Sequence, residues 1–70
     1  MTWYLHSWDK RTRRVMLSGP YDSSVRAVEA ASREWKGQRT PLLIEGPDGE
    51  KIEGVRLAER IKAIQREGAD

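Results

Sequence analysis

The stretch from Tyr21 to Gly37 constrains the fold most, because its apolar side chains repeat with the period of an α-helix. One stripe of this helix would hold Val25, Val28, Ala31, Ser32 and Trp35. Charged side chains occupy the other side. Asp22 or Ser23 can cap the first turn, since a short side-chain oxygen accepts a hydrogen bond from an unpaired backbone N–H. Gly37 can supply the left-handed residue that ends the helix. We expect the apolar stripe of this helix to pack against the core.

Two runs of alternating side chains precede this helix. Residues 2–8 alternate in a segment rich in aromatic residues, and residues 13–17 alternate again, which is typical of β-strands. The polar residues 9–12 lie between them, so the pattern predicts a β-hairpin. We expect residues 18–20 to end the second strand, because Pro20 lacks the N–H that a sheet requires.

The second half of the chain repeats the plan. An apolar run at residues 42–45 is followed by Gly46-Pro47-Asp48-Gly49, a strong turn sequence, and by a returning strand at residues 50–53. From Val55 the helical period returns and Gly68 ends the pattern. The apolar face of this second helix would contain Leu57, Ala58, Ile61 and Ile64.

The order strand, strand, helix, strand, strand, helix predicts a single α+β domain over residues 1–70. We expect an antiparallel or mixed four-stranded sheet with both helices on one face, because each helix carries one apolar stripe. Strand order does not follow from the pattern. A chain of 70 residues buries a small fraction of its surface, so self-association is a further expectation.

Composition argues against several classes of function. The chain has no cysteine, which excludes disulfides, thiolate catalysis and cysteine-bound zinc. No apolar run approaches the ~18 residues of a membrane span, and no leader-like segment opens the sequence, so we expect no membrane partner and a cytoplasmic location.

Catalytic and metal-binding residues are not indicated either. His6 is the single histidine, and no carboxylate stands at a ligand spacing from it. The carboxylates of the second hairpin are better explained as solubilising charges; they are Glu45, Asp48, Glu50 and Glu53. We therefore expect a non-catalytic protein without a metal or cofactor.

The first hairpin stands out by its charge and its aromatic residues. Residues 1–40 hold eight Lys/Arg against four Asp/Glu, and residues 41–70 hold five against seven, giving +4 and −2. Four of the cations are Lys10, Arg11, Arg13 and Arg14. We expect Trp3 and Leu5 to point into the core with Val15 and Leu17. The opposite face of the sheet would then carry Tyr4, His6 and Trp8.

This constellation predicts a nucleic-acid surface. Aromatic rings on a sheet face stack bases, as Tyr4 and Trp8 would, and neighbouring cations neutralise phosphates. The cations assigned to phosphate contact are Lys10, Arg11, Arg13 and Arg14. The alternative is a protein-interaction or homodimerisation module that uses the same face, in a small regulatory or phage-encoded protein, because Tyr, Trp and Arg anchor such contacts.

Two resemblances accompany this interpretation. The segment YDSSVRAVEAASREWKGQRTPLLIEGPDGEKIE resembles the helix, strand, D-G turn and strand of a family of small uncharacterised bacterial α/β domains, which implies the fold and no activity. The stretch from Trp3 to Trp35 resembles the arm-type DNA-binding domains of tyrosine recombinases, in its aromatic strand, basic hairpin and E-A-containing helix. That second resemblance implies DNA binding by the cations of the hairpin.

Overall fold

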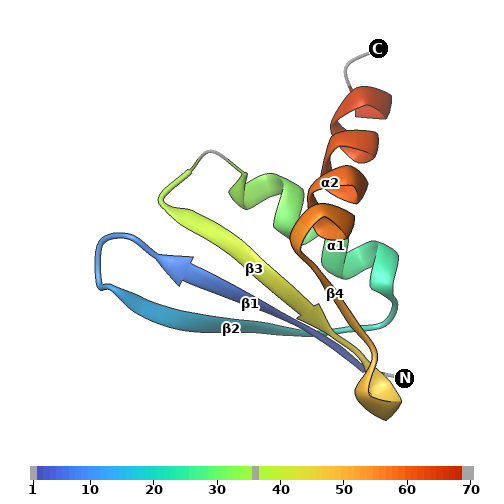
Figure 1. The fold of residues 1–70 in the computed structure, drawn as a ribbon, viewed down its shortest axis with the longest axis horizontal. Helices are drawn as coiled ribbons and strands as arrows, with labels where there is room; N and C mark the ends of the chain where they lie inside the picture. The colour runs from blue at the N-terminus through green and yellow to red at the C-terminus, as the bar shows by residue number, and fades with distance from the viewer. Residues whose placement is uncertain (1, 36, 69–70) are drawn as a thin grey trace.

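The computed structural model describes residues 2–35 and 37–68, and it confirms the predicted α+β architecture. Four strands form one antiparallel sheet, and two helices cover a single side of it (Figure 1). The elements are β1 (Trp3–Asp9), β2 (Arg14–Tyr21), α1 (Ser24–Glu34), β3 (Arg39–Glu45), the 3₁₀ turn η1 (Pro47–Gly49), β4 (Lys51–Glu53) and α2 (Gly54–Gly68).

The strands lie in the order β2-β1-β3-β4, and every neighbouring pair is antiparallel. The two hairpins therefore meet at β1 and β3, which are the central strands. α1 carries the chain from β2 over the sheet to β3, so it lies across the centre of the helix-covered face. β2 and β4 are the edges, and β4 has only three residues.

The core lies between the sheet and the helices. Its members are buried and come from every layer: Leu5, Ala27, Val28, Ala30, Ala31, Ile44, Ile52, Leu57 and Ile61. Trp3, Tyr21, Trp35 and Ile64 pack around this cluster and are partly buried. The predicted core positions of Leu57 and Ile61 are thus confirmed.

The observed helix α1 differs from the predicted helix near both of its ends. Ser23 is the cap, and its Oγ accepts a hydrogen bond from the Arg26 N–H at 3.3 Å. Val25 is exposed, so its core assignment was wrong; the buried side of α1 is mainly alanine, and these small side chains let the helix approach the sheet closely. The helix ends before Gly37, because the backbone at Trp35 is already extended (φ −60°, ψ 128°).

β2 also runs further than expected. The strand continues through Gly19 and Pro20 to Tyr21, which pairs with Trp3, so the predicted break at residues 18–20 was wrong. The missing N–H of Pro20 is tolerated because β2 is an edge strand, where one row of backbone groups has no neighbouring strand.

Candidate functional site

No helix within residues 2–35 and 37–68 covers the second face of the sheet, and we call this face the open face. Leu5, Ser7 and Asp9 of β1 are buried under the helices. Side chains alternate along a strand, so Tyr4, His6 and Trp8 point to the opposite face. The predicted grouping of Tyr4, His6 and Trp8 on one face therefore agrees with the structure.

The inward orientation predicted for Val15 and Leu17 was wrong. Val15 pairs with Trp8 and Leu17 pairs with His6, and residues that pair directly share a face. The two side chains are 55% and 61% exposed. Four residues separate the paired Asp9 and Arg14, so odd positions of β1 lie opposite even positions of β2. A turn with one residue more or fewer would have reversed the whole strand.

β3 adds two leucines to the open face through an irregularity in its pairing with β1. Pro41 pairs with Ser7, and Ile44 pairs with Leu5, both on the helix-covered side. Two residues of β3, Leu42 and Leu43, therefore stand opposite His6 alone. Leu42 is 40% exposed and Leu43 is half-buried.

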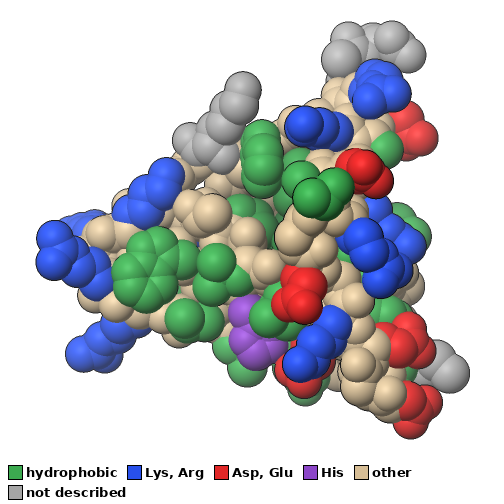
Figure 2. Space-filling model, in the orientation of Figure 1, with side chains coloured by type: hydrophobic (Ala, Val, Ile, Leu, Met, Phe, Trp, Pro, Cys, Tyr) green, Lys and Arg blue, Asp and Glu red, His purple; other side chains and the backbone are tan. Residues whose placement is uncertain are grey.

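The open face is therefore largely apolar at its centre. Figure 2 shows the purple histidine flanked by green side chains, with blue side chains at the left end, where the β1–β2 turn lies in Figure 1. The side chains that make up this apolar patch are Tyr4, Trp8, Val15, Leu17, Leu42 and Leu43, and His6 lies among them.

The predicted phosphate-binding cations lie at or beside the β1–β2 turn, which we call the basic end: Lys10, Arg11, Arg13 and Arg14. Arg14 pairs with the buried Asp9, so its side chain leaves the sheet on the helix-covered side. All four cations are exposed, and none forms an ion pair with another described residue. Lys10 Nζ donates to the carbonyl of Gly37 at 3.4 Å. Trp8 pairs with Val15, one position from Arg14 along β2, and contact of these cations with phosphate stays a prediction.

The opposite end of the sheet is acidic. Its charges lie at the end of β3, in the β3–β4 turn and on β4, and we call this the acidic end: Glu45, Asp48, Glu50 and Glu53, with Lys51 among them. Glu53 pairs with Leu43 and so lies nearest the middle of the sheet. Glu45 Oε1 lies 3.2 Å from His6 Nε2, so this carboxylate also reaches toward the middle of the open face. Red side chains gather near this turn at the lower right of Figure 2.

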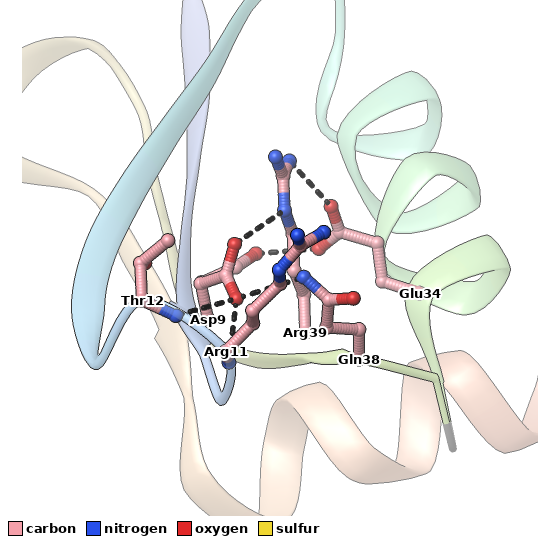
Figure 3. Close-up of polar contacts among 7 residues, drawn as sticks. Asp9, Arg11, Thr12, Glu34, Gln38 and Arg39 are labelled. Atoms are coloured by element: carbon pink, nitrogen blue, oxygen red, sulfur yellow. Dashed lines mark hydrogen bonds and ion pairs between the residues drawn. The ribbon is translucent and has the colours of Figure 1, made fainter.

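A partly buried polar network around Ser7 and Asp9 supports the basic end from the helix-covered side (Figure 3). Ser7 Oγ donates to Glu34 Oε1 at 2.5 Å. Arg39 then joins two carboxylates, with Nη1 3.6 Å from Glu34 Oε2 and Nε 3.6 Å from Asp9 Oδ2. β1, α1 and β3 are thereby tied together at one end of the sheet.

Asp9 organises the turn that carries the cations. Its Oδ1 accepts from the backbone N–H of Arg11 at 2.9 Å, from that of Thr12 at 3.4 Å, and from Gln38 Nε2 at 3.0 Å. Its carbonyl accepts from the N–H of Arg13 at 2.8 Å. Arg13 is held in the left-handed region (φ 58°), so the basic turn has a defined backbone before any ligand arrives.

The sequence analysis did not predict this polar network, although the alternating pattern of β1 contains a signal for it. The alternation of β1 places Ser7 and Asp9 on the same side as Leu5, which marks them as polar residues at core positions. Buried polar groups require partners, so such positions indicate a hydrogen-bonded cluster. The partners come from Glu34, Gln38 and Arg39, far along the chain, and local patterns do not identify them.

We expect Asp9→Asn to lower the melting temperature near neutral pH, because an amide would turn an N–H toward Arg39. The hydrogen bond from Gln38, those from the N–H groups of Arg11 and Thr12, and the Arg39 guanidinium lower the pKa of Asp9, although burial opposes them. A lowered folded-state pKa stabilises the fold above the unfolded-state pKa, and this contribution is lost as pH falls through the folded-state value.

The measurement is thermal unfolding of the native chain and of Asp9→Asn at about pH 6 and about pH 2.5. The difference in melting temperature should shrink on acidification. Asp22→Asn is the matched control, since Asp22 is exposed and Ser23 makes the helix cap, and it should change little at either pH. A difference for Asp9→Asn that is equal at both pH values would contradict the assigned role of its charge.

Other features offer less chemistry. A hollow of about 310 Å³ is lined by Trp3, Ser24, Glu50, Lys51, Ile52, Arg56 and Arg60. A second, of about 260 Å³, lies between the helices and is lined by Val25, Val28, Arg60, Ala63, Ile64 and Glu67. Within residues 2–35 and 37–68, no three histidine or acidic side chains cluster as metal ligands would. No helix in that part of the chain is long and apolar enough to cross a membrane.

Comparison with known proteins identifies no relative. No protein-family model matches the chain, no curated protein matches it, and no solved structure matches it. The function is therefore inferred from the residues of the open face and its two ends.

Proposed function

We propose that the chain is a non-catalytic protein-binding module that docks a protein partner through the open face. The observation that carries this proposal is the register of β1 and β2, which adds Val15 and Leu17 to Trp8 on the exposed side of the sheet. Together with Leu42 they form a patch of exposed large apolar side chains. Contiguous apolar patches on small domains are typical of interaction sites.

The aliphatic side chains in the apolar patch favour a protein partner over a nucleic-acid partner. Valine and leucine side chains have no ring to stack on a base and no donor for a phosphate, yet Val15 and Leu17 occupy the sheet beside Trp8 and His6. Burying one such side chain fully contributes about 1.5–3 kcal/mol. A protein surface of matching shape gains this free energy, whereas a hydrated phosphate backbone does not.

Nucleic-acid binding is a second candidate, favoured by the exposed basic end. Its arginines are Arg11, Arg13 and Arg14, and none has an ion-pair partner among the described residues. The Asp9 contacts fix the turn that presents them. This candidate predicts quenching of tryptophan fluorescence by short single-stranded or duplex oligonucleotides, falling steeply with salt and weakened by Arg13→Ala.

Site-specific photocrosslinking in the host cell tests the protein-binding proposal. A photoreactive phenylalanine analogue replaces Leu17 on the open face, and a matched variant carries it at Val55, which is 73% exposed on α2. We expect covalent protein adducts from position 17 and far fewer from position 55, because only the open face is proposed to contact protein. Equal yields at both positions, or no protein adduct from position 17, would overturn the proposal.

A further inference from the structure

We infer that the hollow beside the start of α2 binds a small phosphate ester whose organic part carries hydroxyl groups, that is, a sugar phosphate. This inference does not rest on the proposed function, because the hollow shares no residue with the apolar patch of the open face. It is carried by two arginines that border the hollow and form no ion pair with another described residue.

Four elements converge on this hollow. Trp3 opens β1, Ser24 opens α1, and Ile52 is the middle residue of β4. α2 follows β4 directly and contributes Arg56 and Arg60 from its first two turns. The hollow therefore lies at the end of the sheet where β1 begins, and the basic end lies at the other end of that strand (Figure 1).

The strand register decides which side chains near β4 face the hollow. Ile52 pairs with Ile44, and both are buried under the helices. Glu50 has an extended backbone (φ −66°, ψ 139°) and stands two positions before Ile52, so its side chain points to the same side. Lys51 pairs with Glu45 and points to the open face, so it borders the hollow through its backbone. The polar side chains of the site are therefore two arginines, one serine and one carboxylate.

Arg56 and Arg60 form the anion-binding part of the site. They are four residues apart on α2, so their side chains leave the same side of the helix. Both are exposed. A guanidinium donates hydrogen bonds in a planar fork that matches the oxygens of a phosphate. A phosphate group has three acceptor oxygens, and the Ser24 hydroxyl supplies a third donor group beside the two arginines.

The rest of the lining selects the organic part of the ligand. Trp3 packs against the core and Ile52 is buried, so they form a fixed apolar wall. Glu50 would repel a second phosphate, whereas its carboxylate accepts hydrogen bonds from hydroxyl groups. The volume of about 310 Å³ is near the lower limit of ligand pockets, which favours a ligand with a single sugar ring.

NMR titration of the purified chain tests the site, with ribose 5-phosphate, inorganic phosphate and ribose as the three probes. We expect ribose 5-phosphate to cause saturable shifts of the Trp3 indole N–H and the Ser24 backbone N–H, because both residues line the hollow. Inorganic phosphate should bind more weakly, since it lacks the contacts of the sugar. Ribose alone should cause no saturable shift, since it lacks the group that the arginines bind.

Arg56→Gln should raise the dissociation constant of ribose 5-phosphate about tenfold, because a charge-assisted contact is lost. Arg66→Gln is the matched control. It removes the same charge from an exposed position in the last turn of α2, outside the hollow, and should leave the dissociation constant unchanged. Far-UV circular dichroism of both variants verifies that the fold is kept.

Glu50→Gln tests the part of the site that contacts the sugar. This variant should bind inorganic phosphate more tightly than the native chain does, because a negative charge leaves the hollow. Its preference for ribose 5-phosphate over inorganic phosphate should fall, since a neutral amide oxygen accepts a weaker hydrogen bond than a carboxylate does.

The outcomes separate this inference from the proposed function. Equal weakening by Arg56→Gln and Arg66→Gln would show a response to net charge alone and would overturn the site. Equal affinity for ribose 5-phosphate and inorganic phosphate would overturn the sugar phosphate as ligand, and the absence of saturable shifts with every probe would overturn the whole inference. Each of these results leaves the protein-binding proposal intact, because the position-17 adducts report on the other face of the sheet. Tight binding of ribose 5-phosphate that Arg56→Gln weakens and Arg66→Gln leaves unchanged supports the inference.

Discussion

Replacing Ile61 by alanine is expected to lower the free energy of unfolding by about 3 kcal/mol. Ile61 is fully buried on the inner side of α2, in the cluster that joins both helices to the sheet. The truncation removes buried methyl groups and leaves a cavity that the surrounding side chains fill only in part. A chain of this size has a small total stability, so the variant should be partly unfolded at room temperature.

Urea unfolding followed by circular dichroism measures this effect, and Val55→Ala on the same helix is the control. Val55 is exposed, and alanine has the higher helix propensity, so this variant should change stability by less than about 0.5 kcal/mol. Equal losses in the two variants would show that α2 is not packed on the sheet as the structure has it.

The helices were predictable because their signals are local. The apolar period of α2 identified Leu57 and Ile61 as core residues, and the cap at Ser23 was one of two candidates. The strand order was not predictable, because an alternating pattern marks which face of a strand is buried and does not name its neighbour. The central position of β1 and β3 depends on contacts between distant parts of the chain.

The candidate site was predictable in part. The cations of the turn and the shared face of Tyr4 and Trp8 follow from the residue types and the alternation of β1. The orientation of Val15 and Leu17 did not follow, because it depends on the number of residues in the turn between the paired Asp9 and Arg14. This one feature changes the open face from an aromatic and basic surface into one with an aliphatic centre.

The contact between Gly46 and Trp3 provides the second large effect. Gly46 has an extended backbone (φ −115°, ψ −172°), which any residue adopts without strain. A Cβ atom at this position would lie 2.5 Å from Cε3 and 2.6 Å from Cη2 of the Trp3 ring. The ring is rigid and packs against the core, so it cannot move aside without disturbing its neighbours.

Gly46→Ala is therefore expected to lower the free energy of unfolding by about 2 kcal/mol, as overpacking does. The clash is with one side chain, so a double-mutant cycle with Trp3→Leu isolates it. In the Trp3→Leu background the alanine should be neutral, or stabilising by about 0.5 kcal/mol, since it reduces the freedom of the unfolded chain. Urea unfolding of the four proteins measures the coupling. An equal cost of Gly46→Ala in both backgrounds would show that the Trp3 ring does not lie over Gly46. It would contradict the packing that the structure gives this end of the sheet.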